Sequence, residues 1–162
     1  TKGSLTLGSL IVEPFSVSHD AADPIGINVF AGNDKATIVT DTGVISDDIL
    51  RRIDDTTLLV LEANYDPHML RFGPYQPFLK QRVASDEGHL SNEMAAQALL
   101  MMKRPDFMQV ILAHRSENNN NSVLVTQTIG KMLVDGGVRI GPEMKLQHGQ
   151  PNEIVSIQSV KR

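Results

Sequence analysis

The sequence predicts one layered α/β domain, in which helices pack against a sheet of strands. Strand-like segments follow one another directly in the first 40 residues, whereas later ones alternate with helix-like segments. Strands that first meander and then alternate with helices are typical of this class. A chain of 162 residues with 41% hydrophobic residues is also long enough to bury a single core.

The first predicted elements are strands. The stretch 5–17 (LTLGSLIVEPFSV) predicts one or two strands interrupted at Gly8 and Pro14. The stretches 26–30 (GINVF) and 36–40 (ATIVT) predict a hairpin, because the AGNDK between them is rich in turn-forming residues. Together these segments account for the meandering part of the sheet.

The first predicted helix covers 47–53 and is capped by Ser46. It carries acidic residues in its first turn and arginines in its last, as the helix dipole favours. The remaining predicted elements are a strand over 57–61, short helices near 67–72 and 77–84, a helix over 92–103 capped by Ser91, a strand over 108–113, a helix from Ser122 to about residue 134, and a last strand near 154–160.

Composition excludes several classes of protein. Because the sequence has no Cys, it has no disulfides, no thiolate zinc site and no cysteine nucleophile, so a metal would be bound by imidazole and carboxylate. No apolar run approaches the roughly 20 residues that span a bilayer, and no signal peptide opens the sequence. We therefore expect a cytoplasmic protein without membrane contact.

The charges and the aromatic residues bear on possible ligands. Residues 1–66 hold four Lys or Arg against eleven Asp or Glu, a net charge of −7, whereas residues 67–162 hold eleven against eight, a net charge of +3. An acidic half suits a cation site and a mildly basic half permits phosphate contact, although ordinary surface charge explains the same asymmetry. Aromatic residues make up only 4% of the chain, which argues against base stacking as its main mode of binding.

Four candidate metal-site or catalytic residues each follow one of the predicted strands: His19, Asp41, Glu62 and His114. Sites in open α/β sheets gather just beyond the C-terminal ends of strands. Imidazole and carboxylate groups together form a plausible set of ligands for a divalent metal. Each residue alone also has an ordinary interpretation, as a solvated loop histidine, a turn aspartate or a strand-end glutamate.

His89 stands just before the predicted helix cap Ser91. The N-terminus of a helix tends to keep an imidazole neutral and able to exchange a proton near pH 7, and the alternative is an ordinary surface loop. The stretch after His114 offers donors that suit an anionic substrate, namely Arg115, Ser116, Asn118 and Asn119. His68 and His148 are predicted to be surface residues.

Four motifs in a fixed order carry a resemblance to a known family: SHDAADPIG at 18–26, TDTG at 40–43, GHLSN at 88–92 and LAHRSENN at 112–119. With this spacing the sequence resembles the second half of the metallo-β-lactamase superfamily. It is most similar to the bacterial branch called YycJ, WalJ or VicX, which is itself similar to ribonuclease Z. The resemblance covers roughly residues 10–135; TDTG is shared widely, whereas the other three motifs are specific to the branch.

This resemblance implies a fold and a set of roles. The fold would be the C-terminal half of an αββα sandwich, a mixed sheet with helices on one face, with two divalent cations, zinc or manganese, between the two halves. His19 would bind one metal, Asp41 would bridge both and His114 would bind the other. His89 would donate a proton, with Glu62 orienting its ring. The implied activity is hydrolysis of phosphodiester bonds, as a 5′-to-3′ DNA exonuclease.

One motif of that family is absent. H-x-H-x-D-H, which supplies four of the seven expected metal ligands, does not occur in the sequence, and the first residue is Thr1. We therefore expect residues 1–162 to be the C-terminal part of a longer enzyme, inactive alone and holding metal weakly or not at all. Nucleic acid and the absent N-terminal half are the expected partners. An exposed sheet face would make the isolated chain a homodimer, either sheet face to sheet face or by exchange of its N-terminal strands.

Two other functions remain open at this point. The same metals could serve a hydrolase of esters, thioesters or lactones, since one fold hosts many chemistries. Alternatively, the chain could be a non-catalytic module that binds a partner through its sheet. Metal titration distinguishes the enzymes from the module, and a panel of substrates distinguishes the two enzymes.

Overall fold

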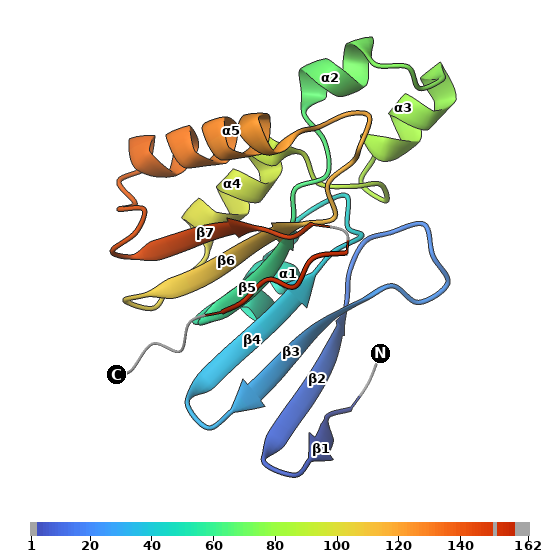
Figure 1. Cartoon of the computed structure of the whole chain (residues 1–162). Coiled ribbons are helices and arrows are strands. Elements are labelled where there is room, and N and C mark those ends of the chain that lie inside the picture. Colours follow the sequence, from blue (N-terminus) through green and yellow to red (C-terminus); the bar gives the residue numbers. More distant parts are fainter. Residues whose placement is uncertain (1–2, 151, 158–162) are drawn as a thin grey trace.

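The structure is a computed structural model that describes residues 3–150 and 152–157. In this part of the chain seven strands form one sheet in sequence order (Figure 1). They are β1 (Leu5–Leu7), β2 (Leu10–Ser16), β3 (Ile25–Ala31), β4 (Asp34–Val39), β5 (Leu58–Glu62), β6 (Met108–Ala113) and β7 (Met144–His148). Strands β1 to β4 pair antiparallel and β4 to β7 pair parallel, so the predicted α/β class with a mixed sheet is confirmed.

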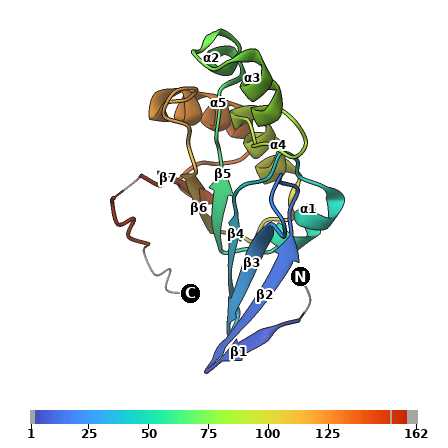
Figure 2. The ribbon, with the colours of Figure 1, turned by 90° about the vertical axis from the view of Figure 1, so that its right-hand side faces the viewer.

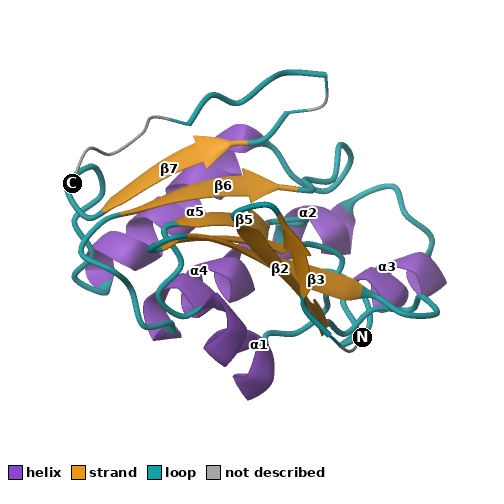
Figure 3. Cartoon of the chain, turned by 90° about the horizontal axis from the view of Figure 1, so that it is seen from below, coloured by secondary structure: helices purple, strands orange, loops and turns teal. Residues whose placement is uncertain are grey.

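Three helices cover one face of this sheet (Figures 2 and 3): α1 (Asp47–Ile53), α4 (Asn92–Met101) and α5 (Ser122–Asp135). Two short helices, α2 (Pro67–Phe72) and α3 (Pro77–Val83), lie beyond the end of the sheet toward which β5 runs. The sequence predicted all five helices, with bounds that differ by no more than about two residues from those observed.

The core lies between the sheet and its three covering helices. Leu59 and Leu61 of β5 and Ile129 of α5 are completely buried there. On the other side of the sheet, Ile27, Ile38, Val60 and Ile111 are neighbours in register across β3 to β6. We call this side the open face, since none of the described helices covers it; Ile38 is 42% exposed there, whereas Ile111 is only 8% exposed (Figure 3).

Local chemistry explains where several elements begin and end. The side chains of Ser46 and Ser91 accept hydrogen bonds from the third residue after each, which caps α1 and α4 as the sequence predicted. Gly8 turns the chain between β1 and β2 with a φ of +60°, a conformation that glycine adopts without strain. Pro14 does not interrupt β2, because β1 pairs no further than Val12 and β2 is an edge strand beyond it.

The predicted last strand near 154–160 is wrong over the described residues 152–157, which form no strand, and its remainder lies outside them. The last strand is instead β7, which pairs with β6. Pattern alone favoured IVSIQSV over MKLQH, but strand formation depends on an available partner and on burial. Ile154 is 96% exposed, whereas Met144 is completely buried.

No helix in the described part of the chain is long and apolar enough to cross a membrane.

Candidate metal centre

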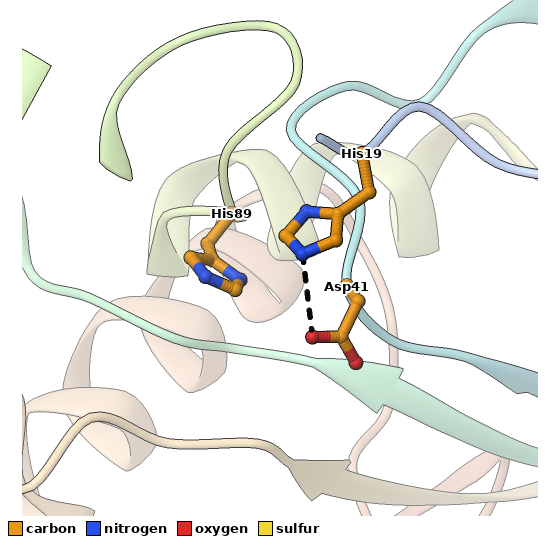
Figure 4. Close-up of side chains that lie close together, drawn as sticks. All are labelled: His19, Asp41 and His89. Atoms are coloured by element: carbon orange, nitrogen blue, oxygen red, sulfur yellow. Dashed lines mark ion pairs between the residues drawn. The ribbon is translucent and has the colours of Figure 1, made fainter. Parts of the chain in front are cut away.

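The loops at one end of the sheet bring together the five residues that the sequence singled out as ligands or catalytic groups. His19 follows β2, Asp41 follows β4, Glu62 ends β5, His89 precedes α4 and His114 follows β6. The ring centroids of His19 and His89 lie 5.1 Å apart, and those of His89 and His114 are separated by the same distance. Figure 4 shows His19, Asp41 and His89 converging from three separate segments.

Glu62 is the buried centre of this cluster. Its side chain is completely buried, and its Oε1 atom lies 2.7 Å from Nδ1 of His89 and 2.8 Å from Nδ1 of His114. The other oxygen, Oε2, accepts hydrogen bonds from the backbone N–H of Thr42 at 3.1 Å and of Leu90 at 3.5 Å. One carboxylate thus orients two imidazoles, whereas the sequence predicted this role for His89 only.

These contacts shift the pKa values of Glu62 and His114. Burial by itself would raise the pKa of Glu62, but hydrogen bonds from His114, His89 and Thr42 outweigh it, and the net pKa is lowered. The hydrogen bond that His114 donates to Glu62 raises the pKa of His114 against the opposing effect of burial. Glu62 is therefore a carboxylate, and it accepts the Nδ1–H protons of both rings.

The tautomer of His19 follows from its partner. Its Nδ1 lies 3.0 Å from the carbonyl oxygen of Gly88, which can only accept a hydrogen bond, so Nδ1 carries the proton. The lone pair is then on Nε2, which lies 3.8 Å from Oδ1 of Asp41. Gly88 must be a glycine, because a Cβ there would lie 2.2 Å from the carbonyl oxygen of Arg82.

Asp41 lies between the two outer histidines. Its Oδ1 atom is 3.8 Å from Nε2 of His19 and 3.7 Å from Nδ1 of His114. Both Asp41 and His114 have positive φ angles, 56° and 52°, which L-residues adopt rarely. Such backbone strain is concentrated at functional sites, where the surrounding structure maintains it.

Two asparagines that the sequence analysis did not single out fix the loops of the cluster. Asn92 and Asn120 are buried and exchange two side-chain hydrogen bonds, of 3.1 and 2.8 Å. Asn120 also donates to the backbone carbonyls of Ala63 and Asn64, directly after Glu62. The signal available in the sequence was the run of four asparagines at 118–121, whose members differ in burial.

A cleft of about 360 Å³ opens beside the histidines. Three of the four predicted substrate-binding residues line it: Arg115, Ser116 and Asn118. The fourth, Asn119, is only 1% exposed and does not line the cleft, so the structure places it inside the loop. Arg82 of α3, which the sequence analysis did not select, lies on the cleft wall.

The other two histidines lie apart from the cluster. His68 is an exposed residue of α2, as predicted. His148 at the end of β7 is half-buried, and its Nε2 lies 2.8 Å from the hydroxyl of Thr126. Burial and the nearby Arg115 lower the pKa of His148.

Comparison with known proteins finds bacterial exodeoxyribonucleases that resemble the chain. The chain is 36% identical over 155 residues to the exodeoxyribonuclease YycJ of Bacillus anthracis. The matched region covers 96% of this chain and 59% of that protein. It is 33% identical over 147 residues to the exodeoxyribonuclease WalJ of Streptococcus pneumoniae strain D39, covering 91% of this chain and 55% of that protein. The chain is thus similar in sequence to YycJ and WalJ over more than nine tenths of its length. It spans somewhat more than half the length of these curated relatives.

Solved structures show that the chain has a metallo-β-lactamase fold. The metallo-β-lactamase fold protein YhfI of Bacillus subtilis matches 91% of the chain and 50% of its own length, with a TM-score of 0.63 and 12% identity. Zn²⁺-bound PqqB of Methylobacterium extorquens matches 90% of the chain and 47% of its own length, with a TM-score of 0.56 and 16% identity. Human tRNase Z, short form, matches 70% of the chain and 38% of its own length, with a TM-score of 0.52 and 21% identity. No protein-family model matches the sequence.

Proposed function

We propose that this chain is the C-terminal part of a metal-dependent DNA exonuclease that cleaves phosphodiester bonds and acts in the cytoplasm. The observation that carries the proposal is the cluster in which the buried carboxylate of Glu62 orients both His89 and His114 beside Asp41 and His19. The names of the two relatives, both exodeoxyribonucleases, supply the substrate class.

The side chains present fit divalent cations. His19 offers the lone pair of Nε2, since its Nδ1–H is held by a backbone carbonyl. His114 likewise donates Nδ1–H to Glu62, which leaves its Nε2 available. Hydrogen bonding of the second ring nitrogen is the usual way in which proteins orient a histidine ligand. Asp41, between the two rings, adds a carboxylate oxygen, and imidazole with carboxylate is a donor set for zinc or manganese.

In this proposal His19, Asp41 and His114 would hold two cations, with Asp41 as the ligand common to both. When bound, the metals supply a nucleophile at neutral pH and stabilise the negative charge that develops on the phosphate. The ligands that H-x-H-x-D-H would add come from the N-terminal half of the enzyme.

His89 has the proposed role of moving a proton. Glu62 holds its Nδ1–H, so the free nitrogen, Nε2, can carry a proton toward the leaving oxygen of the cleaved bond. The ligand atoms of His19, Asp41 and His89 lie within 4.8 Å of one another, so His89 is close enough to be a ligand as well. The two roles differ in what loss of His89 would do: loss of a ligand would release metal, whereas loss of a proton donor would leave the metal bound.

The test is hydrolysis of end-labelled DNA by the full-length enzyme in the presence of Mn²⁺ or Zn²⁺. We expect nucleotides to be released from the 5′ end, and EDTA or the substitution His114→Ala to abolish release. His68→Ala is the matched control, since His68 is an exposed histidine of α2. Activity on ester, thioester or lactone substrates with none on DNA would overturn the proposal.

For the 162-residue chain alone we propose weak metal binding and no measurable hydrolysis. Each cation would have only two protein ligands here, one of them the shared Asp41, and an incomplete set lowers both affinity and water activation. Isothermal titration of the chain with Zn²⁺ measures this directly. A nanomolar site for two ions would contradict the proposal that ligands are missing.

A further inference from the structure

Ser116, a residue of the cleft wall, has a side-chain hydroxyl group whose acceptor sites are both filled. It lines the cleft together with His114, which precedes it by two residues. Its Oγ atom accepts two hydrogen bonds from Asn119, one from the backbone N–H at 3.2 Å and one from the side-chain Nδ2 at 3.3 Å. A hydroxyl oxygen has two lone pairs, so these two donors occupy both of them.

The proton of this hydroxyl group is left without an acceptor in the described part of the chain. With both lone pairs occupied, the group can take a further partner only as a donor. Asn119, which fills the acceptor sites, is inside the loop and does not line the cleft. The O–H bond therefore points away from the loop interior, and a ligand that meets Ser116 in the cleft meets a hydrogen-bond donor.

Asn119 is fixed by contacts with both ends of α2. It is almost completely buried, and its backbone carbonyl accepts a hydrogen bond at 2.9 Å from the N–H of Asp66, the N-cap of α2. Its Oδ1 atom packs against Gly73, the C-cap of α2, where a Cβ would lie only 2.7 Å from that oxygen. The amide therefore has no room to turn away from Ser116.

The orientation of this amide leaves one of its own atoms unpaired. Oδ1 of Asn119 is buried and accepts no hydrogen bond from the described residues. An unpaired buried acceptor costs free energy, and a leucine of nearly the same shape would avoid that cost. Packing alone therefore does not explain the amide, whereas its Nδ2 group supplies the second donor to Ser116. Costs of this kind are typical of functional sites.

The backbone holds Ser116 at a fixed distance from the histidine cluster. Its N–H donates to the carbonyl oxygen of Asn64 at 2.9 Å, and Nδ2 of Asn64 donates to the carbonyl oxygen of His114 at 2.8 Å. Arg115, between the two, also lines the cleft and adds a positive charge. A hydroxyl that can only donate, next to a guanidinium, suits a group that is anionic and offers only acceptors. The non-bridging oxygens of a phosphate are such a group.

We propose that Ser116 donates a hydrogen bond to a non-bridging phosphate oxygen of the bound substrate, and that Asn119 is the positioning residue that keeps this hydroxyl group a donor. Asn119 touches no substrate and acts only through Ser116. The inference rests on the proposed nuclease function and adds how the phosphate is recognised. It concerns the phosphate group alone and is independent of whether the DNA is single- or double-stranded.

The experiment measures kcat and KM of the full-length enzyme on end-labelled DNA with Mn²⁺. The variants are Ser116→Ala, Asn119→Leu and the two substitutions combined. Ser122→Ala is the matched control, since Ser122 is an exposed serine of α5 that does not line the cleft. Thermal unfolding of every variant in EDTA shows whether a loss of activity follows from a loss of stability.

We expect Ser116→Ala to lower kcat/KM about 10- to 100-fold, the effect of losing a hydrogen bond to a charged group. Asn119→Leu should lower it about 3- to 30-fold, because the backbone N–H of residue 119 still occupies one lone pair of the hydroxyl oxygen. Its unfolding temperature should stay within about 3 °C of that of the unmodified enzyme. The combined variant should be no less active than Ser116→Ala, since Asn119 acts through a hydroxyl that is already absent. Ser122→Ala should change nothing.

Three outcomes overturn the inference, and they have different meanings. If Ser116→Ala cleaves DNA as the unmodified enzyme does, the hydroxyl does not bind phosphate and the nuclease proposal stands; this result decides the contact even where Asn119→Leu fails to fold. If the two losses multiply in the combined variant, Asn119 does not act through Ser116. If the unmodified enzyme cleaves no DNA, the proposed function is wrong and the phosphate contact is lost with it.

Discussion

Glu62 binds two imidazoles with one oxygen atom, which makes the positions of His89 and His114 depend on each other. All four groups around its carboxylate are donors, two ring N–H groups and two backbone N–H groups. A carboxylate offers only acceptors and therefore satisfies all of them. The isosteric side chain of Gln cannot replace it, because its amide carries a donor on one side and would accept from only two of the four groups.

We predict that Glu62→Gln lowers the free energy of unfolding of the metal-free chain by at least about 2 kcal/mol, because the amide nitrogen would face buried donors. Urea unfolding in EDTA measures the change. Glu117→Gln, at an exposed residue of the cleft, should stay within about 0.5 kcal/mol. Equal stability of the two variants would mean that Glu62 does not hold the cluster together.

His89 and the metal ligands should respond differently to substitution in the full-length enzyme. We predict that His89→Ala lowers turnover about 10²- to 10⁴-fold, the usual size of a general-acid contribution, while two metal ions stay bound. His114→Ala and Asp41→Ala should instead deplete the metal. Elemental analysis of the purified variants tests this prediction, and a His89 variant that has lost metal would identify His89 as a ligand.

At the scale of elements, the cluster depends on how loops are attached to one another. The loop after β6 is tied to the start of α4 by the amide pair of Asn92 and Asn120. The loop after β4 approaches residues 85–86 so closely that a Cβ on Gly43 would lie 2.2 Å from the carbonyl oxygen of Ser85. Four of the five site residues therefore come from loops, and Glu62 from the end of β5; the relative positions of these segments are set by buried polar contacts and by close backbone approach.

We predict that Asn120→Ala destabilises the chain by about 2–4 kcal/mol, because it leaves Asn92 and two backbone carbonyls without their buried donors. Asn118→Ala should change stability by no more than about 0.5 kcal/mol, since Asn118 is an exposed neighbour in the same loop. Thermal unfolding of both variants provides the comparison. If Asn120→Ala unfolds at the same temperature as Asn118→Ala, Asn120 does not stabilise the loop.

At the scale of the whole molecule, one sheet face is covered and the other is open. The row of Ile27, Ile38, Val60 and Ile111 crosses four strands on the open face, where Ile38 is 42% exposed, Ile27 and Val60 are half-buried and Ile111 is buried. In the outermost strand, β1, Leu5 and Leu7 are 57% and 54% exposed. A large apolar patch is uncommon on a monomer, so the composition of this face favours association.

We predict that the isolated chain is a homodimer at micromolar concentration, joined through its open face. Ile38→Glu should convert it to a monomer, because a charge buried in an apolar contact without a partner is costly. Val123→Glu, at an exposed position of α5 on the covered side, should leave the dimer intact. Light scattering decides between these states, and a 17.8 kDa monomer that binds no apolar dye would contradict the prediction.

The sequence by itself determined the five helices, the strands up to β6 and the residues of the cluster, but it placed the last strand wrongly. Helix caps, turn residues and the alternation of apolar and polar residues are local signals. Strand ends and the spacing of the motifs were enough to select the site residues before any contact was known: His19, Asp41, Glu62, His89 and His114. Site residues lie at strand ends, and strand ends can be located from pattern alone.

Tertiary structure decided what those signals could not. It selected β7 over the more apolar segment near 154–157, because pairing with β6 and burial outweigh pattern. It gave Glu62 a second histidine, separated Asn119 and Asn120 from Asn118 by burial, and brought Arg82 to the cleft. These outcomes depend on contacts between residues about 30 to 60 positions apart, and no local pattern records such distances.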